Sequence, residues 1–142
     1  MNDIEVAGGK AKEREIAEAT ICWCIKKLLP RVRTLTIEVK IKHLKGAMGY
    51  CLNTDDNKTF ELEINKGMSL FDLISTICHE MVHVKQYYRR EMRVVGNNEL
   101  IMWKTKAIKD GVDYMDLPWE KEAFKKECKL AMECFKQLSV SC

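Results

Sequence analysis

The sequence has few of the residues that would place it outside ordinary globular proteins. Its 142 residues include only 7 glycines and 2 prolines, and we find no internal repeat, linker or low-complexity segment. With 46% hydrophobic and 32% charged residues, the composition excludes collagen-like chains and does not resemble that of disordered ones. We therefore expect a single domain spanning residues 1–142, large enough to bury a core without disulfides.

Long apolar runs are absent as well. The longest uncharged stretch near the start covers residues 19–25, whereas a membrane-spanning helix needs about 20 apolar residues. No basic segment followed by an apolar run and a small-residue cleavage site is present. The sequence thus predicts no membrane association and a cytoplasmic location, which would be the host cytoplasm if a phage encoded the chain.

The seven cysteines include no Cys-x-x-Cys pair, so neither a zinc ribbon nor a thioredoxin-type redox site is indicated. Cys22 and Cys24 are one residue apart, but two thiolates do not complete a tetrahedral metal site. We expect the cysteines to be reduced and to serve as small buried side chains.

Hydrophobic periodicity predicts an α+β fold. Strict alternation over residues 35–42 and 59–65 indicates strands, and a turn rich in Asn and Asp between residues 53 and 58 suggests a hairpin with a strand at 48–52. Helical spacing predicts helices near residues 10–29, from an N-cap at Ser69 to about residue 90, and from Pro118 toward Leu138. Residues 99–104 form either a short strand or a packed loop.

The second of these helices contains His79-Glu80-Met81-Val82-His83. Residues four apart in a helix differ by about 40° and one turn of rise, so both imidazoles can reach one zinc ion. Glu80 lies beside them, where its carboxylate can accept the proton of a zinc-bound water. The alternative is two surface histidines on an amphipathic helix, but two of the chain's three histidines fall in this one turn.

A catalytic zinc ion needs a third protein ligand and leaves its fourth position to water. The third histidine, His43, lies upstream at the end of the strand predicted at 35–42. Glu120 is the better candidate, because helical phase places it on the apolar strip of the last helix, near the small Ala123. The same phase turns Glu122 toward solvent with Lys126, Lys129 and Glu133. Alternatively, Glu120 only favours the positive end of the helix dipole.

Other polar and aromatic residues could complete such a site. Tyr87, one turn after His83, or Tyr114 in the connector could donate a hydrogen bond to an oxyanion, although tyrosines at such positions more often pack in the core. Gln86 could orient a ligand or a water molecule. We expect Trp103 and Trp119 to pack the connector against the site.

These residues carry a resemblance to a known family. Gly49-Tyr50, the strand Phe60 to Asn65, the segment His79 to Tyr87, Trp103 and the segment Leu117 to Ala123 resemble SprT-like and related phage-type zinc metallopeptidases, over roughly residues 34–131. The resemblance implies a zincin-like fold. In such a fold a small three- to four-stranded sheet packs on the active-site helix, with an N-terminal and a C-terminal helix, and the metal lies in a cleft between two helices.

The chain also departs from SprT proteins. No histidine follows the motif, so the site is similar to the His-His-Glu arrangement of gluzincins, and no cysteine pairs follow to build a C-terminal zinc ribbon. The predicted function is that of a zinc-dependent endopeptidase acting on a protein or peptide. Zinc would lower the pKa of its water to about 7, and Glu80 would take up the proton and pass it to the leaving amine.

Two other functions remain open at this point. One is a catalytically silent, zinc-stabilised binding module of phage or mobile-element origin. The other is association with nucleic acid, although the net charge of +3 is too small to argue for it alone. Basic residues follow the end of the motif helix and line the last helix, in runs that are usually solvated helix faces: Lys85, Arg89, Arg90, Arg93, Lys121, Lys125, Lys126 and Lys129.

Overall fold

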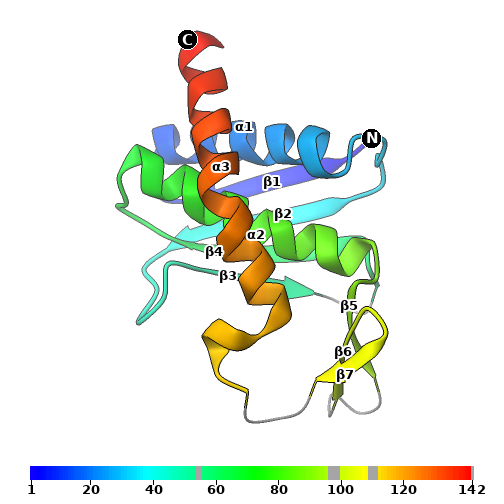
Figure 1. Ribbon diagram of the computed structural model, residues 1–142. Helices are drawn as coiled ribbons and strands as arrows, with labels where there is room; N and C mark the ends of the chain where they lie inside the picture. Colours follow the sequence, from blue (N-terminus) through cyan, green and yellow to red (C-terminus); the bar gives the residue numbers. More distant parts are fainter. Residues whose placement is uncertain (54–55, 96–99, 109–111, 142) are drawn as a thin grey trace.

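The computed structural model describes residues 1–53, 56–95, 100–108 and 112–141, and it confirms the α+β class (Figure 1). The helices are α1 (Ala11–Leu28), α2 (Leu70–Tyr88) and α3 (Pro118–Ser141), with a short 3-10 turn, η1 (Tyr114–Asp116). The strands are β1 (Asp3–Gly8), β2 (Thr36–Lys42), β3 (Gly49–Asn53), β4 (Thr59–Asn65), β5 (Met92–Val95), β6 (Leu100–Trp103) and β7 (Lys106–Ile108).

The larger sheet has the strand order β1-β2-β4-β3. β2 pairs in parallel with β1 and β4, whereas β3 runs antiparallel to β4 and forms the expected hairpin. The alternation of β2 turns Ile37, Val39 and Ile41 into the core, where each is at most 2% exposed. β3 is therefore an edge strand of this sheet, and that edge borders the candidate site described below.

The sequence did not predict β1. Ile4 and Val6 are the only large apolar residues in Asp3–Gly8, and both are only half-buried, so the period-two signal is too short to recognise. β1 exists because it pairs along its whole length with the outer edge of β2, and the Asp3 amide donates to the Leu35 carbonyl at 2.8 Å. With β1 added to the strands that the sequence predicts, the main sheet has four strands.

The three helices lie in layers on the sheet. α2 contacts β3 and β4, α1 contacts β1, and α3 crosses over both helices and extends beyond α1 (Figure 1). Cys24, Cys78 and Cys134 are fully buried, one on each helix, and Cys24 Sγ lies 3.7 Å from Cys78 Sγ. The expectation of buried cysteines is thus confirmed for these three but is wrong for Cys22 and Cys128, which are exposed, while Cys51 is half-buried and Cys142 lies outside the described residues.

A second, smaller sheet occupies the connector between α2 and α3. Its strands β5, β6 and β7 are antiparallel in that order. Of the two alternatives for residues 99–104, the short strand is confirmed as β6 over Leu100–Trp103, and residue 99 lies outside the described part of the chain. None of the helices in the described residues has both the length and the apolar composition to cross a membrane.

Candidate metal centre

The two histidines lie on the buried side of α2. The helix begins after Ser69, whose hydroxyl accepts a hydrogen bond from the Asp72 amide at 3.2 Å. His79 and His83 are each only 6% exposed, and their ring centroids are 5.1 Å apart. The alternative of two surface histidines is therefore wrong.

Glu120 reaches the same place from the first turn of α3. It is 7% exposed, and its Oε1 atom lies 3.0 Å from His79 Nε2 and 3.2 Å from His83 Nε2. His43 lies elsewhere and lines a separate depression with Lys10. The structure thus brings together the three residues that the sequence nominated as metal ligands.

The spacing of these atoms fits a metal ion. One ligand atom from each of His79, His83 and Glu120 lies within 4.8 Å of the others, and all three residues are buried. A tetrahedral ion with bonds of about 2.0–2.1 Å separates its ligands by about 3.3 Å, close to the observed 3.0 and 3.2 Å. This group could hold a metal ion, and within the described residues no other cluster of histidine, cysteine or carboxylate side chains meets the same distances.

A side-chain oxygen lies near the second ring nitrogen of each histidine, but only that of His83 is within hydrogen-bond distance. His83 Nδ1 lies 2.8 Å from Gln86 Oε1, whereas His79 Nδ1 lies 3.7 Å from Glu127 Oε1. Glu127 also accepts a hydrogen bond from the Ser75 hydroxyl at 3.3 Å. Glu127 was not predicted from the sequence, although its spacing of seven from Glu120 places both residues on one strip of α3.

Glu122 does not face solvent as expected. Its Oε1 atom accepts a hydrogen bond from Gln86 Nε2 at 2.9 Å and lies 3.2 Å from Lys85 Nζ. Only Lys126, at 3.6 Å from Oε2, belongs to the predicted solvent-facing set around it. Helical phase predicted correctly which side of α3 Glu122 lies on, but the last turns of α2 pack against that side.

Glu80 lies beside the ligands under strand β3. It is 6% exposed, and β3 can approach it because residue 49 is a glycine. A Cβ atom at Gly49 would lie 2.8 Å from the Thr76 methyl group and 3.2 Å from Glu80 Oε2. The missing side chain therefore makes room for the Glu80 carboxylate.

Burial and the histidines set the charge state of the two carboxylates. Burial raises the pKa of Glu80 above its ordinary value, and the nearby His83 and His79 only partly oppose this. Burial also favours the neutral form of Glu120, but the hydrogen bonds from His79 and His83 outweigh it and lower the pKa of Glu120 to about 2. Glu120 is thus an anion between two imidazoles, as a metal ligand must be.

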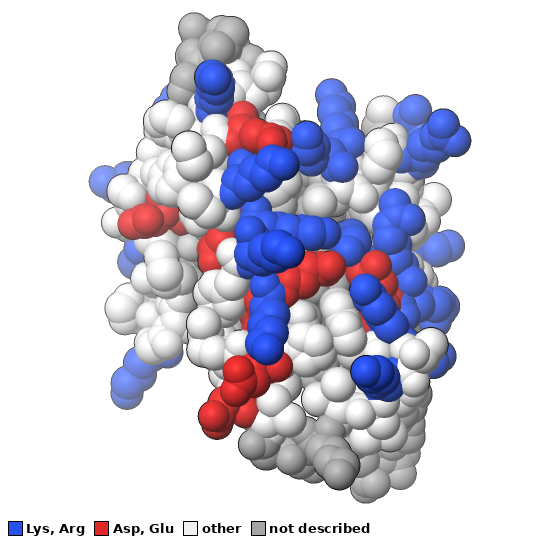
Figure 2. Space-filling model, in the orientation of Figure 1, with Lys and Arg blue, Asp and Glu red and all other residues white. Residues whose placement is uncertain are grey.

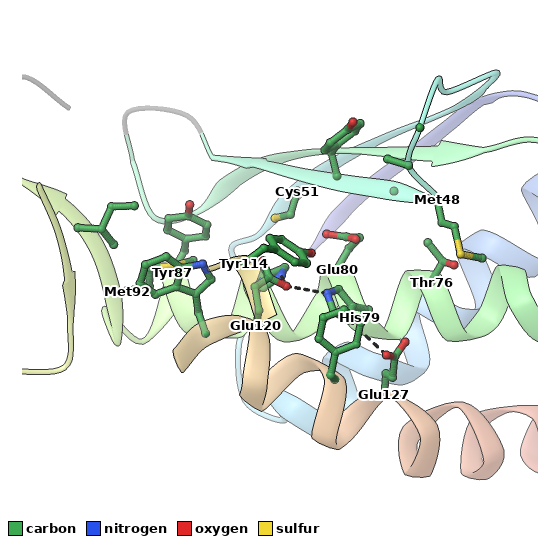
Figure 3. A pocket seen from close by; sticks show the side chains of 18 residues that line it. Met48, Cys51, Thr76, His79, Glu80, Tyr87, Met92, Tyr114, Glu120 and Glu127 are labelled. Carbon is green, nitrogen blue, oxygen red and sulfur yellow. Dashed lines mark hydrogen bonds and ion pairs between the residues drawn. The ribbon is translucent and has the colours of Figure 1, made fainter. Parts of the chain in front are cut away.

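The site opens into a cleft of about 550 Å³ between β3, α2 and α3 (Figure 3). Met48 and Thr76 lie at one end of it, and Tyr87 and Met92 lie at the other. Trp119 also lines the cleft, and its ring centroid is 6.4 Å from that of Trp103 on β6. This contact confirms that the two tryptophans pack the connector against the site.

No family model matches the chain. No curated protein and no solved structure matches it either. The resemblance to SprT-like metallopeptidases therefore stays a prediction, and the function is argued from the site alone.

The two tyrosines named from the sequence both line the cleft. Burial raises the pKa of Tyr87 to about 12, and the neighbouring Cys51 and Glu120 act in the same direction. Burial and a hydrogen bond to Glu120 likewise raise the pKa of Tyr114. Both hydroxyls therefore keep their protons at neutral pH and can donate hydrogen bonds.

Carboxylates lie beside two of the basic residues named from the sequence, Lys85 and Lys126. Lysine and arginine side chains gather along α3 with acidic side chains between them (Figure 2). Lys85 is only 12% exposed in its side chain and pairs with Glu91 at 2.8 Å as well as with Glu122. Lys126 lies 3.6 Å from Glu122. The other residues of these runs are exposed, so association with nucleic acid stays a prediction: Arg89, Arg90, Arg93, Lys121, Lys125 and Lys129.

Proposed function

We propose that the protein is a zinc-dependent endopeptidase with a zincin-like arrangement. The observation that carries this proposal is the convergence of His79, His83 and Glu120 in a cleft, with the Glu80 carboxylate beside them. A metal centre needed only for stability is usually closed by four protein ligands. Three ligands next to an open cleft and an unpaired acid suit catalysis better.

Zinc is the ion that this donor set suits. Two imidazoles and one carboxylate are a common set of protein ligands for catalytic zinc, and they leave one position for water. A bound zinc ion would supply a Lewis acid and a water molecule with a pKa near 7. Glu80, which contributes no ligand atom to the buried triad, would accept the proton of the attacking water and deliver it to the leaving amine.

The surroundings of the site also suit a peptide. Among the described strands, β3 pairs only with β4, so an extended chain can lie along its other edge. The cleft is lined mainly by apolar and aromatic side chains and can receive side chains of a substrate. Tyr114 and Tyr87 offer hydroxyl donors for a developing oxyanion.

The test combines metal content with cleavage of a peptide library. We expect the parent protein to contain one zinc ion per chain and to cleave, and Glu80→Gln to keep the zinc but lose at least 100-fold in rate, as expected for removal of a general base. His83→Ala and Glu120→Ala should lose the metal, while Glu133→Ala, farther along α3, should keep it.

Four outcomes would contradict the proposal. Equal zinc content in all variants would show that these residues do not bind the metal. If a further variant, Glu122→Ala, were the only one to lose zinc, the third ligand would be Glu122 and not Glu120. Cleavage by Glu80→Gln at the parent rate would remove its role as the base. Stoichiometric zinc without hydrolysis of any peptide would instead favour the silent binding module.

A further inference from the structure

Gln86 connects the two helices that carry the metal ligands. Its side chain is fully buried, on the last complete turn of α2. Its Nε2 atom donates to the Trp119 carbonyl at 3.0 Å and to Glu122 Oε1 at 2.9 Å, both in the first turn of α3. Its Oε1 atom lies 2.8 Å from His83 Nδ1.

The two partners on α3 fix the orientation of the Gln86 amide. A carbonyl and a carboxylate can only accept hydrogen bonds, and the amide nitrogen is the only donor on the Gln86 side chain. Turning the amide over would leave Trp119 O and Glu122 Oε1 facing an oxygen. Trp119 O would then lose its Gln86 donor, and Glu122 Oε1 would keep only Lys85, at 3.2 Å. The amide oxygen is therefore held toward His83.

This orientation decides which nitrogen of His83 carries a proton. An oxygen at 2.8 Å from Nδ1 requires a donor there, so Nδ1 is protonated. Nε2 faces Glu120 at 3.2 Å and donates to that carboxylate while no metal is bound. Once Nε2 loses that proton, the ring is neutral, with its proton on Nδ1 and its free electron pair on Nε2. That is the form in which the ring can bind a metal ion.

We propose that Gln86 is a positioning residue of the metal centre, which fixes His83 in its Nδ1-protonated form and ties it to the turn that carries Glu120. The metal-binding consequence rests on the proposed function, but the protonated nitrogen does not. His79 serves as an internal comparison, because its Nδ1 lies 3.7 Å from Glu127, beyond direct hydrogen-bond distance.

The first experiment follows the ring N–H protons of the histidines in the metal-free protein by ¹H–¹⁵N NMR. We expect the parent protein to show a proton on His83 Nδ1 that exchanges slowly with water, because Gln86 accepts it. In Gln86→Leu this proton should be lost or exchange at least tenfold faster, while the Nε2 proton that Glu120 accepts stays and the signals of His79 change little. An unprotonated Nδ1 in the parent, or an equally protected Nδ1 proton in Gln86→Leu, would overturn the proposal whether or not the protein is a peptidase.

The second experiment measures zinc affinity in a double-mutant cycle. Loss of such a hydrogen bond to a ligand typically weakens metal binding 10–100-fold, and we expect this of Gln86→Leu. Gln86→Glu should also weaken binding, because it sets a second carboxylate about 2.9 Å from Glu122. When Gln86→Glu is combined with Glu122→Gln, zinc affinity should be at least tenfold higher than in Gln86→Glu alone. The reason is that the amide then at residue 122 can donate to the carboxylate then at residue 86.

The controls separate positioning from general stability. Ser75→Ala removes the hydrogen bond from Ser75 to Glu127, the carboxylate that lies 3.7 Å from His79 Nδ1. This variant should change zinc affinity less than threefold. Glu122→Gln alone should also change zinc affinity less than threefold, because its amide oxygen can still accept a hydrogen bond from Gln86. If Gln86→Leu binds zinc like the parent, or if the double variant is no better than Gln86→Glu, the proposal is wrong.

Discussion

Single side chains make the candidate site possible partly by being small. At Gly49 the absence of a Cβ atom lets β3 lie over Glu80 and Thr76. The backbone of this residue is not in the left-handed region, so a larger residue could adopt its conformation. Gly49 is therefore needed for the space that it leaves to Thr76 and Glu80, not for its backbone conformation.

Gly49→Ala should therefore impair Glu80 while leaving the metal ligands in place. The new methyl group would press on Thr76 at 2.8 Å and on Glu80 Oε2 at 3.2 Å, and we expect a loss of about 1–3 kcal/mol in stability. Zinc affinity should stay within threefold of the parent, and kcat/KM for a peptide should fall at least tenfold. Calorimetric zinc titration and a cleavage assay check these two results.

The matched control on the same strand is Leu52→Ala. Leu52 is 45% exposed and does not line the cleft, so its truncation should alter neither zinc affinity nor cleavage. If Gly49→Ala cleaved like the parent, the close approach of β3 would have no part in placing Glu80. If it lost zinc, the strand would support the ligands and not the base.

The sequence predicted that His79, His83 and Glu120 come together, and it named Gln86 as a residue that could orient a ligand. It gave the wrong surroundings for Glu122 and missed Glu127. His79 and His83 follow from a spacing within one helix, and Glu120 follows from the phase of another. Glu122 and Glu127 depend on which element covers each face of α3, and phase within one helix contains no information about that. The errors therefore fall on side chains whose partners lie some 36 to 52 residues away.

At the level of elements, the metal centre depends on how closely α2 and α3 pack. Ala123 is fully buried one turn after Glu120, where a larger side chain would hold the helices apart. Ala131 is equally buried two turns further along α3. The two alanines differ in their distance from the ligands, not in their burial.

This pair gives a test of helix spacing. Ala123→Leu and Ala131→Leu should both destabilise the fold by about 1–3 kcal/mol, since both overpack a buried contact. Only Ala123→Leu should also weaken zinc binding by tenfold or more, because it displaces the turn that carries Glu120. Thermal unfolding and zinc titration of both variants measure the two effects. Equal zinc affinity in the two variants would show that the ligands tolerate a shift of α3.

Elements were predictable where they bury a long regular pattern. β2 and β4 alternate over seven residues, and α2 buries twelve residues, so all three were found. β1 has two large apolar residues, and the strands of the small sheet are at most four residues long. Such short strands are held by pairing with neighbours, which the local sequence does not encode.

For the molecule as a whole, the site links α2 and α3, two helices that also pack directly on each other. The ligands come from α2 and α3, while the main sheet is packed chiefly by α1 and α2. Without metal, Glu120 still accepts hydrogen bonds from His79 and His83, so no ligand is left without a partner. The fold should consequently be stabilised by zinc without depending on it.

Removal of the metal by a chelator tests this expectation. Zinc at 100 times its dissociation constant stabilises the folded state by about 2.7 kcal/mol, which corresponds to roughly 5–11 °C in melting temperature for a domain of this size. We expect a shift in that range with an unchanged circular dichroism spectrum at 25 °C, and complete loss of peptide cleavage that returns with added zinc. Unfolding at 25 °C on chelation would mean that the ion is structural, and it would favour the silent binding module over the peptidase.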